Sequence, residues 1–108
     1  MILYRVVRSS EPVDEDFMSD EAKGKPPVPV QVREPVLYRG ISMWDSLDSA
    51  VETARAWRLG DYVAELDIDS GEAVVVTKTR GPGHYTVEGS PALLRSLIRQ
   101  IHEVESVK

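Results

Sequence analysis

The stretch that decides the fold is residues 37–69, LYRGISMWDSLDSAVETARAWRLGDYVAELDID. The sequence predicts a strand over Val36–Ile41, a helix from about Ser46 to Leu59 and a second strand over Tyr62–Ile68. Apolar residues recur every three or four positions in the helix and alternate in the second strand, as each element requires. A strand, a helix and a strand with almost no spacer define a compact unit.

The predicted helix is marked at both ends. Asp45 or Ser46 is expected to cap its first turn, and Gly60 is expected to end it. Its spacing places one apolar stripe on the sheet, made of Leu47, Ala50, Val51, Ala54 and Trp57.

Further strands are predicted on both sides of this unit. Ile2–Val7 alternates and is rich in β-branched residues, which is typical of a strand. A turn at residues 69–72 leads to a strand over Ala73–Thr79, whose continuous apolar centre predicts an interior position. His84–Glu88 is expected to pair with it as a hairpin.

The C-terminal segment is predicted to be helical. Ser90 is expected to be its N-cap, with Pro91 in the first turn. The apolar stripe of this helix would consist of Leu93, Leu94, Leu97, Ile98, Ile101 and Val104.

A long surface loop is predicted over residues 9–29. Its first part is acidic, and the later Pro26, Pro27 and Pro29 favour an extended backbone. Phe17 is expected to anchor the loop in the core. Loops of this length often act as lids or binding segments, although many are only mobile connections.

Length and composition predict one domain over residues 1–108, of the α+β class. We expect a mixed or antiparallel sheet of five to six strands with two principal helices. Hydrophobic residues make up 42% of the chain, which suits a globular protein. No run approaches the roughly 18 apolar residues of a membrane helix. The N-terminus lacks the long apolar region of a signal peptide, so the expected location is cytoplasmic.

Charge and cysteine content exclude several classes of function. The net charge of -5 argues against a module that binds DNA or RNA through bulk electrostatics. A nucleotide ligand stays compatible with it, because one or two arginines suffice to pair with phosphate. Without cysteine there is no disulfide, thiolate metal site or cysteine nucleophile, and the two histidines predict no metal site.

Two segments carry a resemblance to a known family. Tyr38–Asp67, with GIS at residues 40–42 and GDYVAELDI at 60–68, resembles the central part of small ADP-ribosyltransferase-like domains. Leu3-Tyr4-Arg5 resembles the first strand of that family. The LYR, GIS and GHYT segments and the DF of residues 16–17 also resemble short uncharacterised bacterial and phage proteins.

The resemblance implies NAD as substrate and no metal. It implies that Arg5 contacts the phosphate or ribose of NAD and that Ser42 orients the nicotinamide ribose. It also implies a glutamate on the last strand of the pocket, which stabilises the oxocarbenium-like ribosyl centre and steers the nucleophile. Glu88 is the acid in that place by order along the chain.

The hairpin before that glutamate offers another ligand group. His84 follows Arg80-Gly81-Pro82-Gly83, which could present backbone N–H groups and a base to an anion. A tight turn needs the same glycines for conformational reasons alone. His84 is therefore a candidate ligand-binding residue with a purely structural alternative.

Two functions stay open from the sequence. One is an ADP-ribosyltransferase-like domain that binds NAD or a related nucleotide and transfers ADP-ribose. The alternative is a non-enzymatic bacterial or phage interaction or inhibitor protein, whose acidic residues Glu11–Glu21 attract a basic protein partner.

Overall fold

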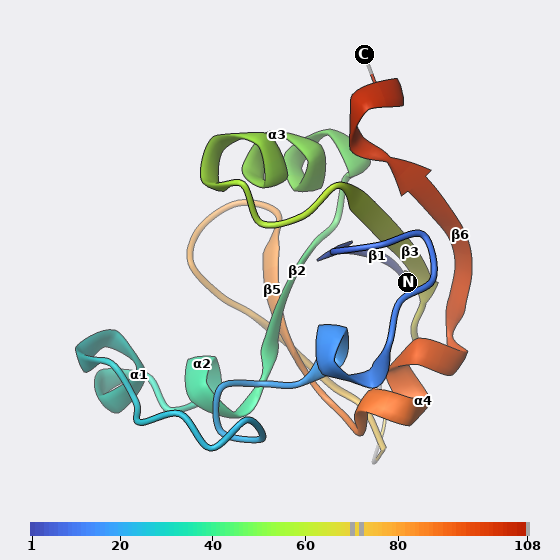
Figure 1. The fold of residues 1–108 in the computed structure, drawn as a ribbon. Coiled ribbons are helices and arrows are strands. Elements are labelled where there is room, and N and C mark those ends of the chain that lie inside the picture. Colours follow the sequence, from blue (N-terminus) through green and yellow to red (C-terminus); the bar gives the residue numbers. More distant parts are fainter. Residues whose placement is uncertain (70, 72, 108) are drawn as a thin grey trace.

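The computed structural model describes residues 1–69, 71 and 73–107. Within them the chain forms an antiparallel sheet with helices on both faces, so the predicted α+β class is confirmed (Figure 1). The strands are β1 (Ile2–Val7), β2 (Ile41–Trp44), β3 (Tyr62–Asp67), β4 (Val75–Lys78), β5 (His84–Glu88) and β6 (Ile98–Glu103). The helices are α1 (Pro29–Arg33), α2 (Val36–Arg39), α3 (Leu47–Trp57) and α4 (Pro91–Ser96), with 3-10 turns at Asp14–Phe17 and Val104–Ser106.

The sheet has six strands within the described residues, in the order β4-β5-β2-β1-β3-β6. Strand β1 pairs with β3 along its whole length, from Ile2↔Asp67 to Val7↔Tyr62. Its pairing with β2 is given by the single register position Tyr4↔Trp44. Figure 1 accordingly shows two groups of strands, β5 and β2 on one side and β1, β3 and β6 on the other.

Apolar side chains pack on both faces of this sheet. Helix α3 covers one face, where Ala50, Val51 and Ala54 pack against Val6 and Val63. The other face holds a larger cluster, to which the 3-10 turn and α4 contribute Phe17 and Leu94. Phe17 is 1% exposed, so the predicted anchor of the loop is confirmed.

Helix α3 begins as the sequence predicts. The Ser46 hydroxyl accepts a hydrogen bond from the backbone N–H of Ser49 at 3.1 Å and caps the first turn. At the other end the left-handed residue is Arg58, with φ 51°, rather than Gly60. Gly60 is needed for a different reason, because a Cβ there would collide with the backbone carbonyl of Val7.

Two predicted elements of the middle of the chain differ from the structure, and a third lies partly outside the described residues. Val36–Arg39 is the short helix α2 and not a strand, because Pro35 has helical dihedral angles and its carbonyl accepts from Tyr38 and Arg39. Strand β4 lies at the edge of the sheet rather than inside it, although its hairpin with β5 is confirmed. The turn predicted at 69–72 includes residues 70 and 72, which lie outside the described residues.

The C-terminal helix is shorter than predicted. Ser90 caps it and Pro91 opens it, as expected, but α4 ends at Ser96 and residues 98–103 form strand β6. This strand pairs with the open edge of β3, and its Ile98 and Ile101 pack against the larger cluster. The backbone hydrogen bonds that β3 offers override the helical spacing of the apolar residues.

The predicted burial of Trp57 was wrong. Ala50, Val51 and Ala54 of the stripe are buried, whereas Trp57 is 75% exposed. Trp57 is the last residue of α3, and its side chain lines a cavity instead of packing in the core. The helix therefore packs on the sheet through its first two turns only.

Candidate functional site

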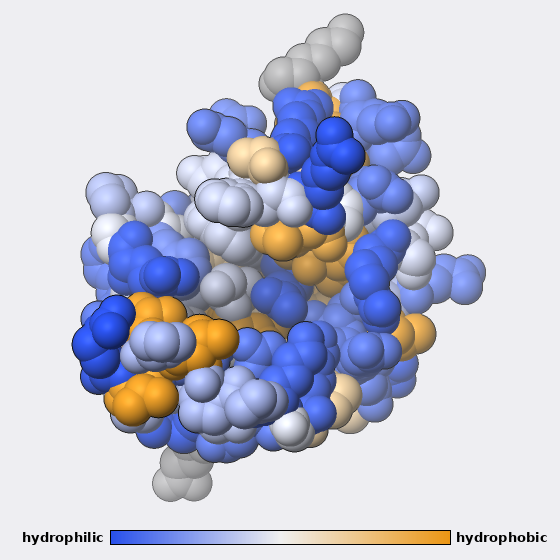
Figure 2. Space-filling view, turned by 60° about the vertical axis from the view of Figure 1, so that its left-hand side comes forward, coloured by the Kyte–Doolittle hydropathy of each residue, from blue (hydrophilic) through white to orange (hydrophobic). Residues whose placement is uncertain are grey.

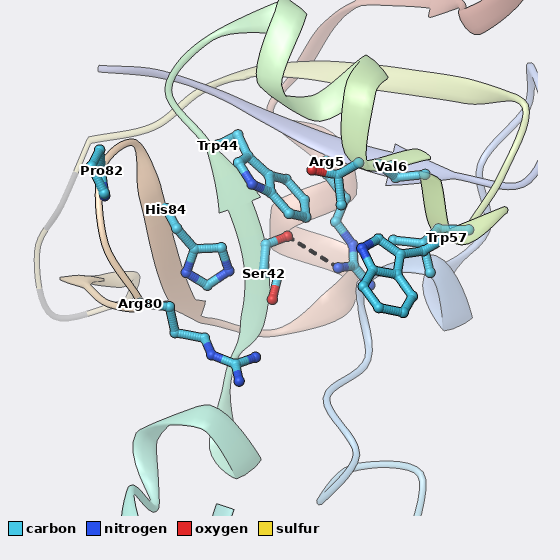
Figure 3. Close-up of a pocket in the computed structure, with 10 residues that line it drawn as sticks. Arg5, Val6, Ser42, Trp44, Trp57, Arg80, Pro82 and His84 are labelled. Atoms are coloured by element: carbon cyan, nitrogen blue, oxygen red, sulfur yellow. Dashed lines mark hydrogen bonds between the residues drawn. The ribbon is translucent and has the colours of Figure 1, made fainter. Parts of the chain in front are cut away.

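Three predicted ligand-binding residues line one cavity. Arg5 of β1, Ser42 of β2 and His84 of β5 border a space of about 550 Å³ (Figure 3). Its other lining residues are Val6, Trp44, Thr53, Trp57, Leu59, Arg80 and Pro82. Among the residues described, none of those lining this space is an aspartate or a glutamate. The cavity therefore combines basic, hydroxyl and aromatic groups, a set that suits an anion carrying an aromatic ring.

Arg5 bridges the two groups of strands. Its Nη1 donates to the backbone carbonyl of Ser42 at 3.1 Å, and its Nε donates to the carbonyl of Asp16 at 3.0 Å (Figure 3). The Ser42 carbonyl lies where β1 and β2 diverge. The Arg5 side chain therefore supplies the hydrogen bond that a neighbouring strand would otherwise give to this carbonyl. Desolvation by burial lowers the pKa of Arg5 to about 10, which leaves the guanidinium charged at neutral pH. Among the described residues it forms no ion pair with a carboxylate side chain, although the charges of Asp16 and Asp20 act on it and raise its pKa against the effect of burial.

His84 is held by the residues that precede it in the hairpin. Its Nδ1 lies 2.9 Å from the Thr79 hydroxyl and 3.2 Å from the Thr79 carbonyl. The indole of Trp44 meets the ring edge-on, with centroids 5.3 Å apart. His84 is 8% exposed, and burial is the main cause that lowers the pKa of its imidazole. The ring is therefore fixed and neutral at pH 7.

Arg80 supplies a second basic group that the sequence reasoning missed. It lies in the turn between β4 and β5 with φ 53°, and the neighbouring Gly81 and Gly83 also have positive φ. The backbone of the turn therefore requires glycine at these positions, which is the purely structural explanation of the Arg80-Gly81-Pro82-Gly83 motif. Figure 3 shows the Arg80 side chain below Ser42 and His84. The signal in the sequence was a basic residue in the turn that leads into the strand of His84.

Trp57 forms an exposed aromatic wall of the same cavity. Its indole stands on the α3 side, with Leu59 next to it, and Figure 3 shows it beside Arg5. A large apolar side chain at 75% exposure gains little stability from its position, so it is free to contact a ligand. The helical spacing masked this role because it placed Trp57 in the apolar stripe.

A second cavity of about 280 Å³ shares Arg5, Ser42 and Arg80 with the first. Its far wall comes from the predicted loop and from α1, with Asp20, Lys23 and Gln31 among the polar lining residues. We call the two spaces together the cleft. Because the segment 18–31 lines the cleft, the loop is part of the candidate site.

Glu88 lies apart from the cavity that holds the other three residues. It stands at the end of β5, four residues after His84, which corresponds to about 13 Å along an extended strand. Its carboxylate pairs with Arg39 of α2, with the Arg39 Nε 3.0 Å from Oε1. The geometry therefore does not bring Glu88 together with Arg5, Ser42 and His84.

The acids of the loop pair largely within the chain. Asp14 pairs with Arg95 at 3.2 Å and Glu15 with Arg8 at 3.4 Å. Asp16 is buried, where it accepts from the Val13 N–H at 2.9 Å and from the Arg8 guanidinium at 3.0 Å. These bonds reduce the charge that the loop offers to a basic protein, and the predicted docking of such a partner stays a prediction.

Asp16 is an acidic residue of the loop that is buried rather than exposed to solvent. Burial alone would raise the pKa of this carboxyl. The hydrogen bond from Val13 and the pairing with Arg8 outweigh that cost and lower the pKa below its usual value. The charged form of Asp16 therefore stabilises the fold.

No group of three or more histidine, aspartate or glutamate side chains in the described part of the chain could hold a metal ion. No helix of residues 1–69, 71 and 73–107 is long and apolar enough to cross a membrane.

Comparison with protein-family models, with curated proteins and with solved structures finds no match.

Proposed function

We propose that this chain is a small ADP-ribosyltransferase-like domain that binds NAD or a related nucleotide in the cleft and transfers ADP-ribose. The observation that carries the proposal is the convergence of Arg5, Ser42 and His84, from three strands, on one cavity together with Arg80. The resemblance of Tyr38–Asp67 to that family implies a role for Ser42, and the resemblance of Leu3-Tyr4-Arg5 to the first strand of the family implies a role for Arg5.

The chemistry of the cleft supports a nucleotide ligand. Two guanidinium groups border the 550 Å³ cavity, which has no carboxylate among its described lining residues, and this favours a diphosphate there; the carboxylate of the cleft, Asp20, lines the second cavity. Trp57 and Leu59 give an apolar wall on which a nicotinamide or adenine ring could stack. The two cavities share a border at Arg5, Ser42 and Arg80, so a ligand such as NAD can place one of its two ends in each cavity.

Glu88 has no part in this proposal as a ligand of the ribosyl centre, because it does not line the 550 Å³ cavity. The acidic-surface alternative gains no comparable observation, since Asp14, Glu15 and Asp16 pair within the chain.

Isothermal titration calorimetry with NAD tests the proposal. We expect binding by the parent protein, and about 10- to 100-fold weaker binding by Arg80→Gln, since a charge-assisted hydrogen bond contributes about 1.5–3 kcal/mol. Arg33→Gln is the matched control, because Arg33 is an exposed residue of α1 that does not line the cleft. The absence of any heat of binding with NAD, or equal losses in both variants, would contradict the proposal.

A further inference from the structure

The hydrogen bonds of His84 determine which ring nitrogen carries the hydrogen. The Thr79 carbonyl, 3.2 Å from Nδ1, has no hydrogen and can only accept. Nδ1 must therefore be the protonated nitrogen of the neutral ring. The lone pair is then on Nε2, and Figure 3 shows a ring nitrogen of His84 on the side of Ser42.

A chain of hydroxyls fixes this arrangement. With Nδ1–H donating toward Thr79, the Thr79 hydroxyl is free to donate to Thr86, whose Oγ1 lies 2.8 Å away. Thr86 is 2% exposed and faces Ser42 across the β2–β5 pairing. A flip of the imidazole would break the bonds at Nδ1, so the ring presents the same nitrogen to the cavity.

The charges around His84 keep this nitrogen unprotonated. Arg80 in the turn and Arg5 on β1 are cations that border the same cavity. Asp45, which follows β2, approaches Gly83, where a Cβ would lie 2.9 Å from its Oδ1, and it does not line the cavity. Burial is the main cause that lowers the pKa of His84; the hydrogen bond that its Nδ1–H donates to the Thr79 carbonyl raises that pKa, and the charge of Arg80 lowers it.

We propose that His84, through Nε2, is the general base of the ribosyl transfer and takes the place on β5 that the resemblance assigned to a glutamate. This inference rests on the proposed function. In the step, the bond between C1′ of the ribose and the nicotinamide nitrogen breaks, and its electron pair returns to the pyridinium ring. The acceptor oxygen forms the new bond to C1′ while its proton passes to Nε2. The imidazolium then loses that proton to solvent.

Water is the simplest acceptor, so hydrolysis of NAD to ADP-ribose and nicotinamide is the reaction to measure. Removal of a general base typically costs about 10²–10⁴-fold in rate. We expect His84→Gln to lower kcat by at least about 100-fold while the Kd for NAD changes by less than about threefold. His102→Gln is the matched control, because the other histidine of the chain pairs with Glu65 at 2.9 Å, away from the cleft.

The pH profile of the parent protein gives a test that does not depend on a variant. The base acts when it is unprotonated, so kcat/KM should rise with pH and level off above the pKa of His84. That pKa lies below its ordinary value of about 6.5. Nitrogen-15 NMR of the free protein should give the same pKa for His84 and show hydrogen on Nδ1 and none on Nε2 at pH 7.

The outcomes separate this inference from the proposed function. Failure of NAD to bind overturns both. Binding without hydrolysis, or hydrolysis that His84→Gln leaves unchanged, overturns the role of His84 and leaves the nucleotide site standing. A profile without the His84 pKa, or a hydrogen on Nε2, also overturns it. Loss of hydrolysis with retained binding, together with the matching profile, supports it.

Discussion

At the residue scale, Arg5 connects the sequence to the site most directly. Its position on β1 follows from the alternation of Ile2–Val7, which is a local property. Its hydrogen bonds reach Asp16 and Ser42, residues that are 11 and 37 positions away. The same guanidinium therefore closes a gap in the sheet and places a positive charge at the border of both cavities.

Asp16 gives a prediction for stability. Asp16→Ala should lower the free energy of unfolding by about 1–3 kcal/mol at pH 7, because it leaves the Val13 N–H without its acceptor. Asp14→Ala, which removes an exposed ion pair, should cost less than about 1 kcal/mol. Urea denaturation measures both variants.

The pH dependence of that difference follows from the lowered pKa of Asp16. A carboxyl whose pKa is lower in the folded state contributes stability above its unfolded pKa of about 3.9 and loses it as pH falls through the folded value. The gap between parent and Asp16→Ala should therefore be full at pH 6 and shrink in acid. A gap that stays constant down to pH 2 would contradict the charged role of Asp16.

At the element scale, α3 has two functions along its length. Its first turns bury Ala50, Val51 and Ala54 against the sheet, and its last residue, Trp57, borders the cavity. On the face of the molecule that Figure 2 shows, most residues are polar, and the apolar residues form separate areas among them. The buried residues of α3 differ from the residues that border the cavity, Thr53 and Trp57, so the packing of the helix and its contribution to the cleft can be tested separately.

Ala54→Asp tests the packing of α3. Ala54 is 2% exposed, so the new carboxylate would be a buried charge without a partner, at a cost of about 3–5 kcal/mol. Ala56→Asp makes the same change on an exposed position of the same helix and should alter the melting temperature little. Equal melting temperatures for the two variants would be inconsistent with the packing described.

At the scale of the whole molecule, the sheet is divided where β1 and β2 meet. Tyr4↔Trp44 is their register position, and Arg5 supplies a further link between the two groups of strands. The cleft lies at this division, with residues of β1, β2 and β5 on its walls. A ligand bound there would contact both groups of strands.

Binding of NAD should therefore raise the melting temperature. At ten times its Kd, a ligand that binds only the native state adds about 1.4 kcal/mol, which corresponds to roughly 5–10 °C for a domain of this size. Nicotinamide at the same concentration as NAD should give a smaller shift, because without phosphates it does not engage Arg5 and Arg80 and its Kd is higher. Differential scanning fluorimetry measures both, and equal shifts would argue against pairing of these arginines with phosphate.

The sequence by itself determined the features that depend on neighbouring residues. The cap of α3 at Asp45 or Ser46, the first turn at Pro91, the glycines at 81 and 83 and the alternation of β1 and β3 involve interactions within a few positions. The α+β class follows from these elements. Arg5, Ser42 and His84 could be named as candidates because they lie on such strands or next to such a turn.

Only the tertiary structure decided where those elements meet. Residues 98–103 form a strand because β3 offers an open edge, and Trp57 is exposed because α3 ends beside a cavity. Likewise, the chain order that suggested Glu88 could not show that His84 is the residue of β5 in the cavity of Arg5 and Ser42. Pairing partners and cavities are made by residues far apart in the chain, so local spacing cannot specify them.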